Sequence, residues 1–141
     1  MIAYKIVWER VSSFEFCSAF VPPNVERFFT TYKIGEPAFP PEGTALFAFD
    51  TKVHAIKYAS RMGWTLMGIL SPNEHRVLFR CEVEKASFKI HRIPKDVCYA
   101  QLSEFWTNTI RHRRARIGFG TDPMFAGTIL CSSITLLERI V

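Results

Sequence analysis

Four arginines near residue 110 are the strongest chemical signal in the sequence: Arg111, Arg113, Arg114 and Arg116. The formal net charge is +5, and without these four arginines the chain would net only +1. Clustered arginines neutralise phosphates and release counterions, which drives nucleic-acid binding without sequence preference. At the end of a helix they would instead complement its dipole, or they would pair with acidic side chains. The cluster predicts a polyanion site, with a nucleic acid or an acidic protein surface as the partner.

Metal ligands and nucleophiles occur in the sequence, but not at the spacing that metal centres or common enzymes use. The cysteines include no CxxC pair, which disfavours a zinc ribbon or finger, and the histidines show no HxxxH or HExxH spacing. The chain also has no glycine-rich phosphate loop and no GxSxG nucleophile elbow. We therefore expect no metal and no cofactor, and an enzyme is the less favoured class. The residues concerned are Cys17, Cys81, Cys98, Cys131, His54, His75, His91 and His112.

The cysteines are better explained as parts of the core. Cys17, Cys81 and Cys131 each fall inside an apolar or strand-like segment. Because a free cysteine packs as a small hydrophobe, we expect buried thiols. Disulfide bonds stay open as an alternative, since intracellular proteins of hyperthermophiles contain them.

Length and composition indicate a single domain over residues 1–141. The chain is 48% hydrophobic and 14% aromatic, which is typical of a packed interior. No apolar run approaches the length of a membrane span, and residues 1–9 lack the apolar core of a signal peptide. We therefore expect an intracellular protein, in a host cell if it is viral, with no membrane contact.

Alternating polar and apolar residues predict strands. In residues 2–10 the alternation places Ala3, Lys5 and Val7 on one side and Tyr4 and Ile6 on the other, as in a half-buried strand. The same reasoning predicts strands at 14–20, 76–84 and 128–135 and a strand buried on both faces at 46–49. Residues 28–34 fit either a short helix end or a strand.

The clearest helix is expected between Asp50 and Gly63. Asp50 is a suitable N-cap, and Gly63 is a suitable C-terminal stop. The expected apolar face comprises Val53, Ala55, Ile56, Ala59 and Met62, and the expected polar face comprises His54, Lys57 and Arg61.

A second, weaker helix is expected over residues 96–110. Prolines and glycines predict irregular loops at 35–44 and 117–123. The elements do not alternate as βαβ units. The sequence therefore predicts an α+β fold with a mostly antiparallel, curved sheet of about five to seven strands and about two helices.

Several short segments look familiar. Tyr32-Lys33-Ile34-Gly35 forms a YxxG step, a Pro/Gly loop follows at 41–44, and an LFxFD segment at 46–50 leads into the helix. Together with Cys81-Glu82-Val83 and the segment 127–135, this pattern resembles an uncharacterised family of small phage, archaeal-virus and prokaryotic proteins. The resemblance implies a viral or prokaryotic source and carries no known function.

A second resemblance, one of layout, is to ADP-ribosyltransferase-like folds. The residues that carry it are Asp50 at a strand end, Tyr58 on the helix, and Glu82 or Glu84 on a later strand. It implies binding of a nicotinamide dinucleotide, with a glutamate at the ribose. The small hydroxyl residues that the family has after its second strand are absent from 46–49, and its arginine or histidine on the first strand is missing.

The favoured function is a non-enzymatic binding or interaction module. Nucleic-acid binding through residues 111–116 is one form of it. A protein interface or a homodimer through the apolar loop 38–41 and the aromatics of the first hairpin is another. An ADP-ribosyltransferase-like enzyme, active or degenerate, is the alternative.

Overall fold

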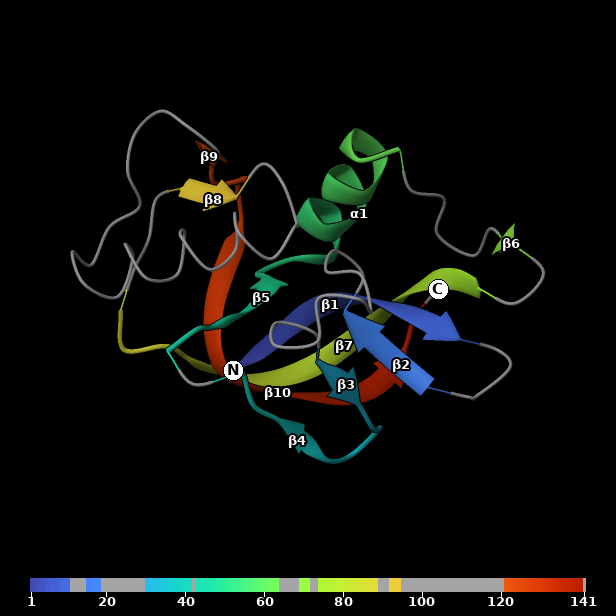
Figure 1. Cartoon of the computed structure of the whole chain (residues 1–141), viewed down its shortest axis with the longest axis horizontal. Coiled ribbons are helices and arrows are strands. Elements are labelled where there is room, and N and C mark those ends of the chain that lie inside the picture. The colour runs from blue at the N-terminus through green and yellow to red at the C-terminus, as the bar shows by residue number, and fades with distance from the viewer. Residues whose placement is uncertain are drawn as a thin grey trace.

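The computed structural model describes residues 1–10, 15–18, 30–41, 43–63, 69–71, 74–88, 92–94 and 121–140. These residues form ten strands and one helix, arranged as Figure 1 shows. In chain order the elements are β1 (Ile2–Arg10), β2 (Glu15–Ser18), β3 (Thr31–Tyr32), β4 (Pro37–Ala38), β5 (Leu46–Phe49), α1 (Lys52–Arg61), β6 (Ile69–Ser71), β7 (Glu74–Lys85), β8 (Arg92–Pro94), β9 (Thr121–Pro123) and β10 (Thr128–Arg139).

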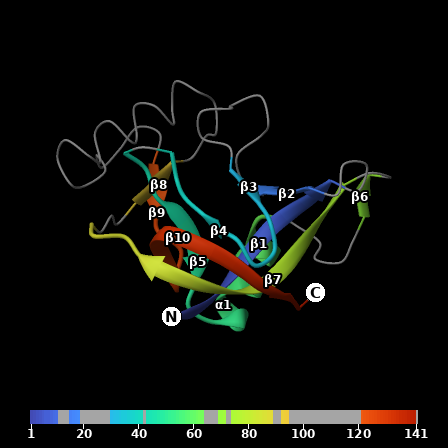
Figure 2. The same cartoon turned by 90° about the horizontal axis from the view of Figure 1, so that it is seen from below.

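Four strands pair in a closed cycle, which we call the strand ring: β1, β7, β10 and β5. Strand β1 pairs with β7 along its whole length, β7 pairs with β10, β10 pairs with β5, and β5 returns to β1. Every pairing is antiparallel, and Figure 2 shows these strands wrapping around one another. The expected antiparallel, curved sheet is therefore confirmed. Its curvature goes far enough that the sheet meets itself, which the sequence did not indicate.

The short strands extend the wall of the ring where β5 ends. Among the described residues, β1 pairs with β5 only at Tyr4 and Phe49, and from Val7 onward β2 pairs with β1 on that side. In the same way β10 leaves β5 after Cys131 and pairs with β4 at Ile134. Strand β3 pairs with β2. Between β1 and β10, the wall is thus formed by β5 over one part of their length and by β2, β3 and β4 over the next part.

Period-two alternation sorts the side chains into two cores. The larger core lies inside the ring, because alternate residues of its strands face one another there. It comprises Ala3, Val7, Tyr32, Ala38, Leu46, Ala48, Val77, Phe79, Cys81, Val83, Cys131, Ile134 and Leu136. The smaller core lies outside the ring, where α1 covers β1, β5 and β7. It comprises Ile6, Phe49, Ala55, Ala59 and Leu78. Strand β1 is therefore buried on both faces, and the expectation of a half-buried strand is wrong.

The helix forms where it was expected, with two corrections. Thr51, and not Asp50, is the N-cap: its hydroxyl accepts a hydrogen bond from the backbone N–H of His54. The helix ends before Gly63, whose φ of 71° suits a glycine stop.

The second correction concerns the apolar face of α1. Within α1 only the small residues Ala55 and Ala59 are fully buried. Val53 and Ile56, expected in the core, are 58% and 41% exposed. Met62 is exposed as well.

Of the other predicted elements, some are confirmed, some are corrected, and some lie outside the described residues. The strands at 46–49, 76–84 and 128–135 are confirmed as β5, β7 and β10, and residues 15–18 of the second strand form β2. Residues 31–32 are a strand, and the expected loops contain β4 and β9. The helix expected at 96–110 lies outside the described residues. Within the described part of the chain, no helix has the length and apolar character needed to cross a membrane.

Candidate functional site

The arginine cluster falls in a part of the chain that the structure does not describe. Arg111, Arg113, Arg114 and Arg116 lie between the described ranges 92–94 and 121–140. Their binding of nucleic acid or of an acidic surface therefore stays a prediction. Cys98 lies in the same gap.

Inside the strand ring, Lys5 provides a charged group that the sequence patterns did not single out. Alternation along β1 places Lys5 between Ala3 and Val7, which are both fully buried in the ring. The Lys5 side chain itself keeps partial exposure. Its amine therefore lies among core side chains, while the residue as a whole keeps partial exposure.

The Lys5 amine is held by a backbone carbonyl. Its Nζ donates to the carbonyl oxygen of Phe47 at 2.6 Å. This contact lies where β1 diverges from β5, two residues along β5 from the single β1–β5 pair at Phe49. The lysine side chain thus joins the two strands where their ladder has ended. A carbonyl is neutral, so it orients the ammonium without neutralising it.

Burial makes the charged form of Lys5 costly. Loss of hydration lowers the pKa of Lys5 from its ordinary value of 10.5 to about 8, and the nearby Cys131 and Cys81 thiols oppose this only in part. A lysine of this kind is uncharged in a sizeable fraction of molecules at slightly alkaline pH. Perturbed titration of this sort is typical of functional sites, although structural groups show it too.

Tyr32 lies beside this amine. Its side chain is 2% exposed, and its ring centroid is 5.6 Å from Lys5 Nζ, within the range of a cation–π contact. Among the described residues, the Tyr32 hydroxyl has no hydrogen-bond partner. Burial raises the pKa of Tyr32 far above its ordinary value, so the hydroxyl keeps its proton and can donate it to an acceptor. A buried hydroxyl without a partner destabilises the fold, which makes it a candidate for ligand contact.

Two thiols complete the surroundings of Lys5. Cys81 and Cys131 are fully buried and free. Burial raises the pKa of Cys81 to about 12 and that of Cys131 to about 11, so both stay protonated and unreactive at neutral pH. The expectation of free buried cysteines is confirmed for these two and for Cys17. No group of three or more metal-ligating side chains occurs among the described residues.

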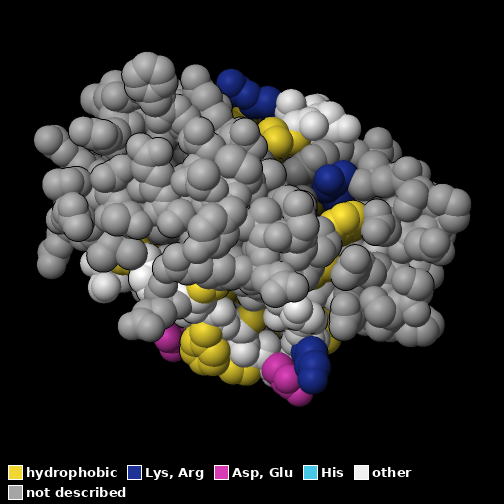
Figure 3. All heavy atoms as spheres, in the orientation of Figure 1, with side chains coloured by type: hydrophobic (Ala, Val, Ile, Leu, Met, Phe, Trp, Pro, Cys, Tyr) yellow, Lys and Arg dark blue, Asp and Glu magenta, His cyan; other side chains and the backbone are white. Residues whose placement is uncertain are grey.

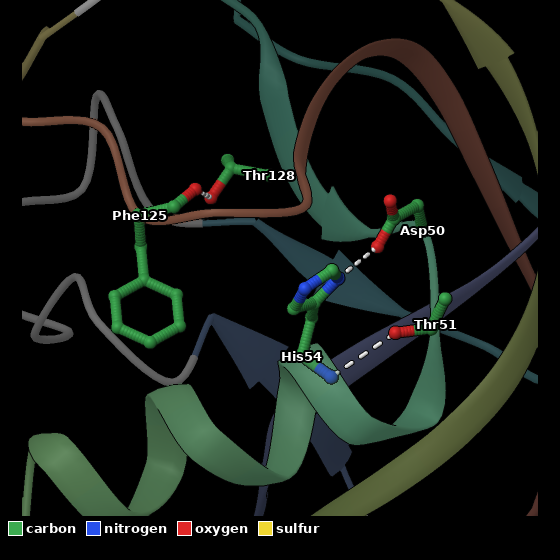
Figure 4. Close-up of polar contacts among 5 residues, drawn as sticks. All are labelled: Asp50, Thr51, His54, Phe125 and Thr128. Atoms are coloured by element: carbon green, nitrogen blue, oxygen red, sulfur yellow. Dashed lines mark hydrogen bonds and ion pairs between the residues drawn. The ribbon is translucent and has the colours of Figure 1, made fainter.

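A second polar cluster joins α1 to the start of β10 (Figure 4). His54 Nδ1 lies 2.6 Å from Asp50 Oδ1, and the Asp50 backbone N–H donates to the carbonyl of Gly127 at 2.8 Å. A carboxylate that orients an imidazole is the arrangement of a general base. The neighbouring Thr128 hydroxyl, however, already donates to the Phe125 carbonyl at 2.6 Å.

The fit of Gly127 shows what this second cluster does. A Cβ atom at Gly127 would lie 2.2 Å from His54 Nδ1 and 2.5 Å from Asp50 Oδ1, so the glycine backbone packs closely against both side chains. These contacts explain the pair of His54 and Asp50 as a structural link between α1 and the turn before β10. We therefore take the interior of the ring, and not this cluster, as the candidate site.

The residues that suggested an ADP-ribosyltransferase-like layout have structural contacts of their own. Glu82 is exposed and accepts a hydrogen bond from the N-terminal amine of Met1. The Tyr58 ring packs against those of Phe49 and Phe125, at centroid distances of 5.0 and 5.4 Å. Glu84 is exposed on β7. The enzyme alternative stays a prediction.

The loop expected to serve a protein interface is partly exposed. Phe39 is 65% exposed, while Ala38 is buried and pairs with β10. Figure 3 shows hydrophobic side chains beside β4 at the lower edge of the molecule, with acidic and basic side chains next to them.

The sequence signal that could have identified Lys5 is the side of β1 on which alternation places it. Lys5 shares one side of β1 with two small apolar residues, Ala3 and Val7, but a charged residue in an alternating strand normally indicates the solvent side. Comparison with known proteins adds no further guide, because no family model, no curated protein and no solved structure matches the chain. The resemblance to small phage, archaeal-virus and prokaryotic proteins stays a prediction.

Proposed function

We propose that this protein is a binding module that takes a small anion, such as a carboxylate, inside the strand ring beside Lys5 and Tyr32. The observation that carries the proposal is the buried Tyr32 hydroxyl, which has no partner among the described residues and belongs to the aromatic ring that faces the Lys5 amine. This is the binding class favoured by the sequence, proposed for other residues than the arginine cluster.

The hydrogen-bond donors of Lys5 and Tyr32 favour a ligand that carries several acceptor atoms. A lysine ammonium has three donors, and Lys5 uses one of them for the Phe47 carbonyl. The Tyr32 hydroxyl adds one more donor. A carboxylate supplies two oxygens and a negative charge, and its hydrogen bonds to charged donors are the strong kind.

Electrostatics supports the same ligand class. Burial destabilises the Lys5 ammonium, as its lowered pKa shows. A bound anion would compensate that charge and raise the pKa again, so ligand binding would recover part of the free energy lost by burying the amine. Affinity should therefore fall as the pH rises through about 8, where Lys5 loses its proton.

The test is a thermal-shift and NMR titration with sodium lactate, against sodium chloride at equal ionic strength. A ligand at a hundred times its Kd stabilises the folded state by about 2.7 kcal/mol. We expect stabilisation of the wild type and of the control variant Lys57→Met, whose lysine is exposed on α1. Lys5→Met and Tyr32→Phe should lose it. An equal effect of lactate on wild type and Lys5→Met would contradict the proposal.

A second candidate function is polyanion binding through Arg111, Arg113, Arg114 and Arg116. Four arginines within six residues support it. The double variant Arg113→Glu and Arg114→Glu should elute from heparin or DNA columns at clearly lower salt than the wild type. Unchanged retention would overturn this function and leave the ring site unaffected.

A further inference from the structure

We propose that Lys5 is also a covalent site, at which its amine captures a small carbonyl compound, such as a 2-oxo acid, as an imine. This rests on the proposed function, because the carboxylate of the ligand would occupy the same place in the ring. Besides its negative charge, the ligand must then carry a carbonyl group.

Position and orientation make Lys5 suitable for this reaction. Its Nζ is anchored to the neutral Phe47 carbonyl at 2.6 Å, so no acidic side chain is shown holding it in the charged form. Apart from Tyr32, the side chains of the surrounding core cluster are apolar or are protonated thiols. Among the groups described around it, the amine is the one nucleophile whose pKa burial brings closer to neutrality.

Tyr32 supplies the second group that imine formation needs. A carbonyl under attack develops negative charge on its oxygen, and a donor at that oxygen lowers the barrier. The Tyr32 hydroxyl is buried, keeps its proton and has no partner among the described residues. This hydroxyl would donate to the carbonyl oxygen of the ligand, while the aromatic ring of Tyr32 faces the Lys5 amine.

The reaction balances without any oxidant or reductant. The lone pair of neutral Lys5 Nζ attacks the carbonyl carbon, and the electron pair of the C=O bond moves to oxygen. Transfer of a proton from nitrogen to this oxygen gives a carbinolamine. Its C–O bond then breaks with release of one water molecule, and the nitrogen lone pair forms the C=N bond. The amine and the carbonyl compound thus give an imine and water, reversibly.

The experiment is reductive trapping of the full chain with pyruvate and cyanoborohydride at pH 7.5, followed by peptide mass spectrometry. We expect labelling of Lys5 at least about tenfold faster than that of the exposed Lys57, because burial lowers the pKa of Lys5 and so increases its neutral amine at this pH. Saturating lactate should protect Lys5 and leave Lys57 unprotected. Tyr32→Phe should slow labelling of Lys5 alone, and Lys5→Arg should abolish the label at that position.

The outcomes separate this inference from the proposed function. If lactate binds but pyruvate labels Lys5 no faster than Lys57, the covalent site is overturned and anion binding stands. If Lys5 is labelled rapidly but lactate neither binds nor protects it, the covalent site stands and carboxylate binding is overturned. If neither occurs, both are overturned. An unchanged labelling rate in Tyr32→Phe would overturn the part assigned to the hydroxyl.

Discussion

Replacing Lys5 by methionine should make the stability of this protein depend differently on pH. Below about pH 8 the Lys5 amine is charged in both the folded and the unfolded chain, and the folded state bears the full penalty of burying it. Between about pH 8 and 10.5 the folded state loses the proton first, so the unfolded chain binds more protons and rising pH stabilises the fold. Methionine has a similar length and no charge, and it removes this effect.

The magnitude follows from the change in pKa. A fall from 10.5 to about 8 corresponds to about 3 kcal/mol at 1.36 kcal/mol per unit, and the partial exposure of Lys5 reduces this to about 2 kcal/mol. Loss of the bond to Phe47 adds a cost of about 1 kcal/mol at every pH. The stability of Lys5→Met relative to the wild type should therefore fall by about 2 kcal/mol between pH 7 and 10.

Urea unfolding at several pH values from 7 to 10 measures this difference directly. Cys81 and Cys131, whose raised pKa values lower stability above about pH 9, are present in both proteins, so subtraction removes most of their effect. Lys57→Met is the matched control and should show a constant difference from the wild type. If the difference for Lys5→Met also stays constant within about 0.5 kcal/mol, the amine is not desolvated and the reasoning about the site fails.

Three further predictions test other contacts of the structure. Tyr32→Phe should leave the free energy of unfolding unchanged or raise it by up to about 1 kcal/mol, since the hydroxyl it removes is buried without a described partner; a clear loss in urea unfolding would show that the hydroxyl is bonded. Gly127→Ala should destabilise the fold by at least about 2 kcal/mol, because its Cβ would lie 2.2 Å from His54 Nδ1. Gly35→Ala shares the positive φ but meets nothing within 4 Å, so it should cost only about 1 kcal/mol, and equal thermal shifts would contradict the contact. Thr51→Ala should cost about 1 kcal/mol through loss of the N-cap, whereas Thr51→Ser should retain most of the stability.

The long elements were predictable because their signals are local. Strands β1, β7 and β10 extend over nine or twelve residues, enough for alternation to be recognised. Five other strands have two or three residues, which is too few for any period to show. The N-cap was missed for a related reason: Asp50 and Thr51 are adjacent residues of the preferred capping types, and the sequence contains no basis for choosing between them.

The exposed side of α1 was predicted incorrectly for a different reason. Val53 and Ile56 are apolar, and a hydrophobic pattern assigns such residues to the core. The buried side of α1 instead follows Ala55 and Ala59, which pack with Ile6, Phe49 and Leu78. At about 100° per residue, Val53 lies nearly opposite Ala55 on the helix, so the two cannot share one face.

By itself, the sequence determined the antiparallel strands, the position of the helix, the apolar setting of Cys17, Cys81 and Cys131, and the local concentration of positive charge at 111–116. Tertiary structure decided that the sheet closes into a ring and that both faces of β1 are buried. It also decided that Lys5 lies inside with Tyr32. The physical reason is that Lys5 and Tyr32 belong to β1 and β3, which are not paired with each other among the described residues but each pair with β2, and no local pattern records which side chains meet across a closed sheet.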